Sequence, residues 1–241
     1  MERTIDRRFR GPARSGNGGY VCGLIAEAMG GAPAAVRLHA PPPLDVPLTL
    51  EPYDGCWFLR QGETIIGSGA PAPVSLDPPA PPTLAEAREA VDRYAGRDAH
   101  VFPECFVCGP ARTRPDALAI HPGPVPGRDL VAAPWTPVEE LSVEDGTVRP
   151  AIAWAALDCP GYFGLQRSGL AAVLGTLQAV ILDPIWVGDE HIVIGWRGPT
   201  QGRKHHAGSA IFTADGDLVA KADAIWVELK GGVEDGGVPG T

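Results

Sequence analysis

The sequence predicts an α+β protein made of two consecutive units, each with one helix followed by antiparallel strands. The same order of segments occurs before residue 71 and again after residue 149. In each case an apolar helical segment is followed by four strand-like segments. Turn signals at Asp54-Gly55 and Asp215-Gly216 separate strand-like segments and are typical of β-hairpins. A parallel sheet would need a helix between successive strands, and the sequence indicates none there.

In the first unit, residues 1–70, the segment GNGGYVCGLIAEAMGG predicts a helix that ends at Gly30-Gly31. Strands are expected over residues 34–40, 46–53, 55–62 and 63–69. The apolar residues that recur at helical spacing are Val21, Leu24, Ile25, Ala28 and Met29.

Residues 71–100 are expected to form a proline-rich linker and a peripheral helix. Six of the twelve residues in PAPVSLDPPAPP are proline, which neither a helix interior nor a central strand tolerates. Thr83 and Glu86 then form a capping-box pattern, and the helix is expected to run to Gly96.

The second unit, residues 101–229, contains the apolar segment PAIAWAALDCPGYFGL, which predicts a buried helix interrupted near Pro160. Strands are expected in LGTLQAVIL, EHIVIGW, HHAGSAIFT and LVAKADAIWVEL. In the last strand Ala220, Ala222 and Ala224 share one face, so a helix could lie close against it. Residues 230–241, with many glycines, are expected to be a flexible tail.

Composition excludes several classes of protein. The 241 residues are 44% hydrophobic and 20% charged, with a net charge of −9, which argues against nucleic-acid binding and against a polybasic membrane surface. No apolar run reaches the roughly 20 residues that cross a bilayer, and no apolar stretch follows the charged N-terminus. We therefore expect a soluble, cytoplasmic protein whose five cysteines are free thiols.

Three short segments resemble one superfamily. Gly18 to Leu24 looks like the glycine-led start of a hotdog helix, and Trp154 to Asp158 is similar to the aspartate-bearing central helix of acyl-CoA thioesterase II enzymes. Residues 202–220 resemble the closing hairpin of those proteins. The resemblance covers residues 9–229 and implies a double hotdog, with two curved antiparallel sheets each wrapped around a central helix. It also implies thioester hydrolysis with no cofactor beyond the coenzyme A moiety of the substrate.

Asp158 is the leading candidate for the group that activates water. Its apolar neighbours in the sequence are expected to raise its pKa; alternatively, it caps a helical segment near Pro160. The amides of Gly19 and Tyr20, at a helix N-terminus, are the expected oxyanion donors, unless the glycines form an ordinary turn with Asn17 as N-cap. Glu27, on the same helix stripe, is a fallback catalytic acid or a salt-bridged residue.

Other site residues are predicted further along the chain. The position in the last strand at which the resembled family carries a catalytic glutamine corresponds to Ala224. The family also has a polar partner on the strand after the second helix, and Thr176 and Gln178 are the expected stand-ins for it. Arg203, Lys204 and His205 form the one dense basic cluster and could hold the phosphates of coenzyme A, or could simply be solvated.

No metal site is predicted from the motifs. Cys105 and Cys108 form a single CxxC, and His100 and His121 do not give a familiar zinc spacing, so a turn between the units is the favoured interpretation. The motifs of serine hydrolases, P-loop NTPases, zincins and dinucleotide-binding proteins do not occur.

Three functions follow from this pattern. The first is an acyl-CoA thioesterase with a small-molecule acyl thioester as substrate. The second is a non-catalytic acyl-CoA or fatty-acyl binding protein on the same fold. The third is a hydratase or dehydratase, which is disfavoured because neither helix carries a histidine. The site is expected to form between the two units of one chain, and the chain to form a homodimer or a higher even oligomer.

Overall fold

The structure, a computed structural model, describes residues 1–143, 145–167 and 169–230. Apart from Lys230, the expected tail of residues 230–241 lies outside the described residues. Among the described residues, no helix combines the length and the apolar composition needed to cross a bilayer.

The first unit contains one central helix and five strands. The hairpin between β3 and β4 turns at Asp54-Gly55, where both residues have positive φ angles, as a type I′ turn requires. The elements are β1 (Glu2–Thr4), α1 (Gly18–Ala28), β2 (Ala34–Leu38), β3 (Pro47–Tyr53), β4 (Cys56–Gln61) and β5 (Thr64–Pro71).

The segment between the units begins without regular secondary structure and continues into α2 (Leu84–Ala90). The capping box of Thr83 and Glu86 is present, but α2 is shorter than predicted and gives way to 3-10 turns before Gly96. The elements of the second unit are β6 (Gly123–Pro124), β7 (Val131–Trp135), α3 (Pro150–Ala156), α4 (Asp158–Gly164), β8 (Ala172–Ile181), β9 (His191–Gln201), β10 (Lys204–Thr213) and β11 (Leu218–Glu228).

The strands form one continuous antiparallel sheet of 11 strands, and the two sheets expected from the sequence are its halves, joined edge to edge. The strand order is β1-β3-β4-β5-β2-β8-β11-β10-β9-β7-β6. The half-sheets meet where β2 pairs with β8, from Ala34 opposite Ala179 to Arg37 opposite Thr176. β2 and β8 are each the edge strand of their own half-sheet. Their pairing therefore satisfies backbone N–H and C=O groups that two separate sheets would leave unpaired.

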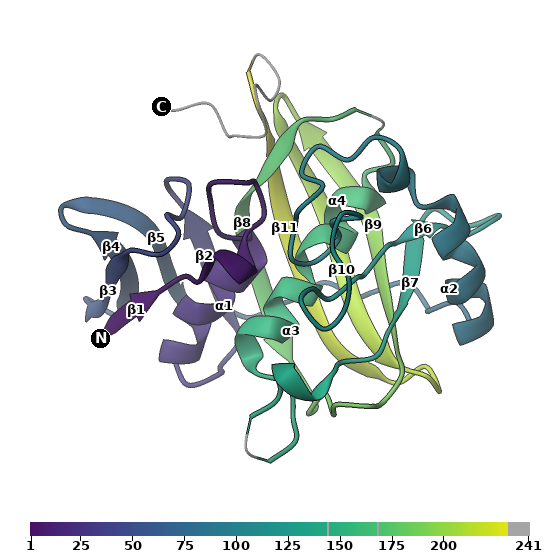
Figure 1. Ribbon diagram of the computed structural model, residues 1–241, viewed down its shortest axis with the longest axis horizontal. Coiled ribbons are helices and arrows are strands. Elements are labelled where there is room, and N and C mark those ends of the chain that lie inside the picture. The colour runs from purple at the N-terminus through teal and green to yellow at the C-terminus, as the bar shows by residue number, and fades with distance from the viewer. Residues whose placement is uncertain (144, 168, 231–241) are drawn as a thin grey trace.

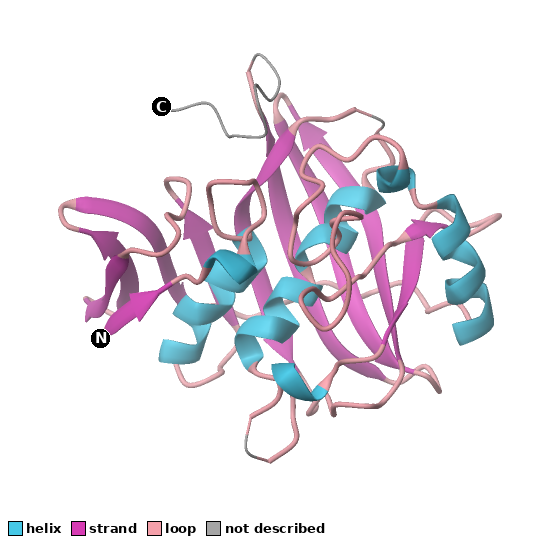
Figure 2. Ribbon diagram, in the orientation of Figure 1, coloured by secondary structure: helices cyan, strands magenta, loops and turns pink. Residues whose placement is uncertain are grey.

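The three central helices cover one face of this sheet, α1 over the first half and α3 and α4 over the second (Figures 1 and 2). Ala220, Ala222 and Ala224 of β11 are buried as predicted. A very close approach of helix to sheet lies on β9, where a Cβ added at Gly195 would overlap the Pro160 carbonyl of α4.

Helices α1 and α3 pack closely because α1 presents glycines to its neighbour. A Cβ at Gly23 would lie 2.5 Å from the Cα of Ala151. We expect Gly23→Ala to lower the free energy of unfolding by about 1–3 kcal/mol, since the added methyl forces the helices apart. Gly161→Ala is the matched control, because a Cβ there would meet Ala207 at an ordinary 3.5 Å. Thermal unfolding of both variants checks this; equal effects would contradict the packing argument.

Candidate active site

Asp158 is placed by the break in the second helix. Pro160 has no N–H to donate to the carbonyl four residues before it, so the helix is interrupted after α3, and α4 starts at Asp158. Asp158 is only 2% exposed. The predicted break is therefore confirmed, and it puts a carboxylate in the interior at a helix junction.

The two oxygens of the Asp158 carboxylate have different environments. Oδ2 accepts hydrogen bonds from Asn17 Nδ2 at 2.7 Å and from the Gly19 amide at 3.0 Å. Oδ1 is buried and has no hydrogen-bond partner among the described residues. Gly19 must be glycine here, since a Cβ would lie 2.5 Å from the Asp158 Cβ. The hydrogen bonds to Oδ2 thus fix the orientation of the side chain, while Oδ1 has no hydrogen-bond partner among the described residues.

Burial raises the pKa of Asp158 to about 7. The Gly19 amide and the Asn17 side chain oppose this effect, because both stabilise the charged form, whereas the Cys105 sulfur raises the pKa further. A carboxylate with such a pKa is a much stronger base than an exposed aspartate and is still deprotonated in part at neutral pH.

Asp158 lines a cavity of about 340 Å³ at the junction of the two units. The cavity lies beside the β2–β8 seam and is mainly apolar, with a volume in the range of small-ligand pockets. Its lining includes Gly18, Leu38 and Pro42 from the first unit and Tyr162, Leu174 and Trp226 from the second.

The two predicted oxyanion donors are already used within the protein. The Gly19 amide donates to Asp158, and the Tyr20 amide donates to Asn17 Oδ1 at 2.9 Å. Gly18 is the first residue of α1 and lines the cavity, and its amide donates no hydrogen bond to any residue that the structure describes. At this helix N-terminus, the Gly18 amide is thus the one without an acceptor among the described residues, whereas the Gly19 and Tyr20 amides have one.

Asn17 is a site residue that the sequence analysis named only as a possible N-cap. It is the N-cap of α1, and its Nδ2 group also holds Asp158, which lies 141 residues away in the chain. Since one amide side chain performs both tasks, the helix start and the carboxylate are fixed to each other.

Glu27 does not reach the cavity. Its carboxylate accepts a hydrogen bond from the Ala151 amide at 2.9 Å and lies 3.7 Å from Arg149. It thus caps the N-terminus of α3, as the salt-bridge alternative implied. We expect Glu27→Gln to leave kcat unchanged for the thioester hydrolysis that the sequence resemblance implies, because an amide oxygen can still accept the hydrogen bond from the Ala151 amide. A large loss of turnover in a steady-state assay would restore the fallback role.

Thr176 and Gln178 are not brought to Asp158. Both lie on β8 on either side of Leu177, which is fully buried beneath the helices, so their side chains point to the opposite face of the sheet. Gln178 Nε2 donates to the Pro73 carbonyl of the linker, and Thr176 lines a separate hollow of about 180 Å³. The described lining of the Asp158 cavity includes neither residue, nor Ala224.

The basic cluster divides into a buried and an exposed part. His205 is 1% exposed, and its ring contacts Glu228 Oε2 and Thr200 Oγ1, each at 3.2 Å, so it is a structural residue. Arg203 and Lys204 are exposed at the β9–β10 turn, and Lys204 pairs with Val227, which lines the cavity. Because Lys204 precedes the buried His205 on β10, its side chain points to the opposite face of the sheet from His205.

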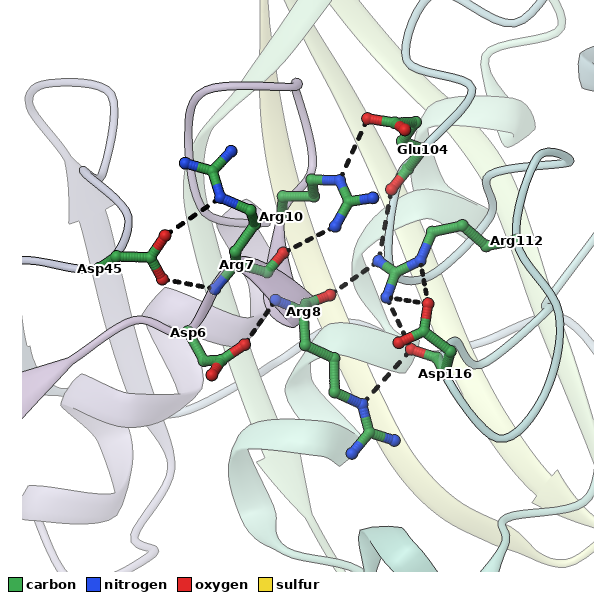
Figure 3. Close-up of polar contacts among 8 residues, drawn as sticks. All are labelled: Asp6, Arg7, Arg8, Arg10, Asp45, Glu104, Arg112 and Asp116. Carbon is green, nitrogen blue, oxygen red and sulfur yellow. Dashed lines mark hydrogen bonds and ion pairs between the residues drawn. The ribbon is translucent and has the colours of Figure 1, made fainter.

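The loop that carries Cys105 and Cys108 forms part of the cavity wall, although it was predicted as a turn between the units. Arg112 fastens this loop to the N-terminal segment by donating to the Arg8 carbonyl at 2.7 Å and to the Asp116 carboxylate (Figure 3). Arg10 pairs with Glu104 at 3.2 Å. The network holds this loop in place, with Cys105 Sγ 3.8 Å from Asn17 Nδ2.

Comparison of the sequence with protein-family models and with curated proteins finds no match. The fold matches solved structures over most of the chain. A tesB protein of Mycobacterium avium subsp. paratuberculosis is 13% identical, with 89% of this chain and 88% of that chain covered and a TM-score of 0.55. A conserved protein with a hot dog fold from Alicyclobacillus acidocaldarius is 12% identical, with 96% and 93% covered and a TM-score of 0.60.

A third structure, from Thermobifida fusca and described as a candidate thioesterase II, is 15% identical, with 95% and 92% covered and a TM-score of 0.58. At these identities the similarity shows the fold alone. The protein has the hotdog fold, as the sequence resemblance implied.

Proposed function

We propose that the protein hydrolyses an acyl thioester in the cavity at the junction of its units, with Asp158 as the general base. The observation that carries this proposal is the asymmetry of the buried carboxylate. Oδ2 is held by Asn17 and Gly19, while Oδ1 has no partner among the described residues. A buried, oriented carboxylate that lines an apolar cavity and has one unpartnered oxygen suits proton removal from a bound water.

The reaction follows from this geometry. Water attacks the thioester carbonyl carbon while its proton passes to Asp158 Oδ1, and the carbonyl oxygen gains negative charge. The Gly18 amide, at the positive end of α1, stabilises that oxygen. The tetrahedral intermediate then breaks its carbon–sulfur bond, and the leaving thiolate takes the proton from Asp158. The products are a carboxylic acid and a free thiol.

The two units would act as a duplicated hotdog pair inside one chain. The first unit supplies the α1 N-terminus with Asn17 and Gly18, and the second supplies Asp158. The direct hydrogen bond between Asn17 and Asp158 supports this division of the site. The homodimer or higher even oligomer stays a prediction, which sedimentation velocity can test.

Coenzyme A thioesters are the proposed substrates, because the exposed cations Arg203 and Lys204 of the β9–β10 turn suit phosphate groups. The test is to incubate the purified protein with acyl-CoAs of increasing chain length and to follow the release of free thiol. Turnover with at least one chain length is expected. If no acyl-CoA releases thiol while the protein is folded, the proposal is contradicted.

A second candidate function is acyl-ligand binding without hydrolysis. It is favoured by the placement of Thr176 and Gln178 outside the cavity, which leaves Asp158 without those expected helpers. Tight binding of an acyl-CoA with no release of free thiol would favour this binding function over hydrolysis. Hydration chemistry gains little from His100, although this residue lines the cavity, because both of its ring nitrogens are engaged.

A further inference from the structure

Three cysteine thiols gather in the wall of the cavity. Cys105 and Cys108 come from the loop before β6, and Cys159 comes from the first turn of α4. Their sulfur atoms all lie within 4.8 Å of one another, and Cys105 Sγ is 3.7 Å from Cys159 Sγ. All five cysteines of the chain are free, so these three are available as thiolate ligands.

The spacing of the sulfurs suits a tetrahedral metal ion. With zinc–sulfur bonds of about 2.3 Å, two thiolates on one zinc lie about 3.8 Å apart. The distance between Cys105 and Cys159 agrees with that edge. A disulfide would instead need a separation of about 2.05 Å and would leave one of the three thiols unpaired.

The two chelating segments are held rigidly before any ion binds. The CxxC turn closes with a hydrogen bond of 2.9 Å from the Gly109 amide to the Cys105 carbonyl. Gly109 is required there, since a Cβ would lie 2.5 Å from the Cys105 nitrogen. The network of Arg112 in Figure 3 fixes the loop, and Pro160 fixes the start of α4 next to Cys159. Preorganised ligands lose little entropy on binding.

His100 supports the cluster from outside. Its Nδ1 accepts a hydrogen bond of 2.9 Å from the Phe102 amide, so in the neutral ring Nε2 carries the proton. Nε2 therefore donates to Cys108 Sγ, at 3.2 Å, and is not a metal ligand itself. A hydrogen bond of this kind stabilises a metal-bound thiolate and orients it.

We propose that Cys105, Cys108 and Cys159 bind a zinc ion whose fourth position faces the cavity. All three cysteines line the cavity, which gives the ion a route in and leaves its last position open to water or a ligand. The site adjoins Asp158 through Asn17, whose Nδ2 lies 2.7 Å from Asp158 Oδ2 and 3.8 Å from Cys105 Sγ. The sequence analysis predicted no metal because the third ligand, Cys159, lies 54 residues after Cys105.

Metal content tests the proposal without any assay of turnover. The full chain, expressed with zinc in the medium and purified without a histidine tag, is expected to hold one equivalent of zinc by elemental analysis. Cys159→Ser is expected to lose most of it. Cys22→Ser and Cys56→Ser are matched controls that keep the metal, because both thiols lie outside the cluster. His100→Ala is expected to weaken affinity about 10- to 100-fold while the stoichiometry stays at one.

Cobalt(II) exchanged into the folded protein provides a second measurement that does not depend on a variant. Thiolate-to-cobalt charge transfer in the near ultraviolet and intense tetrahedral d–d bands are expected. Wild-type protein that takes up no zinc under reducing conditions, or a cobalt complex without thiolate bands, would overturn the proposal. So would a Cys105–Cys159 disulfide that forms in air and cannot be prevented by added zinc. Because none of these readouts uses an acyl-CoA, they stand or fall separately from the proposed hydrolysis.

Discussion

Asp158→Asn is expected to lower kcat for thioester hydrolysis by about 10²- to 10⁴-fold, the range for loss of a positioned general base. The asparagine oxygen can still accept from Asn17 Nδ2 and the Gly19 amide, so the fold should remain intact. Its amide nitrogen cannot take a proton from water. Since burial raises the pKa of Asp158 to about 7, an uncharged side chain at this position should keep or raise the thermal unfolding temperature.

Two further substitutions show whether the Asp158 effect is chemical. Asp158→Ala removes the acceptor for Asn17 and Gly19, so it should lower the unfolding temperature as well as the turnover. Asp183→Asn changes an exposed carboxylate and should change neither. Thiol release and thermal unfolding, measured on all three variants, separate these cases. Wild-type turnover in Asp158→Asn would rule out Asp158 as the base.

Gly18→Pro is expected to lower kcat by about 10²- to 10³-fold relative to Gly18→Ala, the cost of losing one oxyanion donor. Proline removes the Gly18 amide proton, yet it is favoured at the first position of a helix. Asn17 already has the extended conformation that a residue before proline needs, with φ −60° and ψ 131°.

Gly18→Ala is the matched control because both substitutions add a Cβ, which would lie 2.9 Å from the Leu174 side chain. Both variants should therefore show the same steric effect on KM and stability, and only proline should show the additional loss of kcat. Equal turnover in the two variants would mean that the Gly18 amide does not stabilise the transition state.

The parts of the fold that could be predicted depend on local rules. The Asp54-Gly55 turn and the capping box at Thr83 and Glu86 need only neighbouring residues, and both are confirmed. Asp158 could also be singled out as a candidate, because it is the one acidic residue in an apolar helical segment and stands just before Pro160. The joining of the half-sheets at β2 and β8 depends on contacts between residues far apart in the chain.

The sequence itself contained a signal against placing Thr176 and Gln178 at the site. Residues on either side of a strand position share the face opposite to it, and the apolar Leu177 between Thr176 and Gln178 already indicated that both point away from the helices. The role of Asn17 at Asp158 had no such local signal. Its capping role is visible in the sequence, but the second hydrogen bond joins residues 17 and 158. The proximity of Cys159 to the CxxC loop also had no local signal in the sequence, because it joins residues far apart in the chain.

A crystal structure of the Asp158→Asn variant with an unhydrolysed acyl-CoA tests the central claim most directly. The account predicts the thioester in the cavity beside the β2–β8 seam, with its carbonyl oxygen about 2.7–3.1 Å from the Gly18 nitrogen. A water or the carbonyl carbon should lie next to the side chain at position 158. An acyl-CoA bound with its thioester outside this cavity, or with the carbonyl turned away from Gly18 and position 158, would contradict the account.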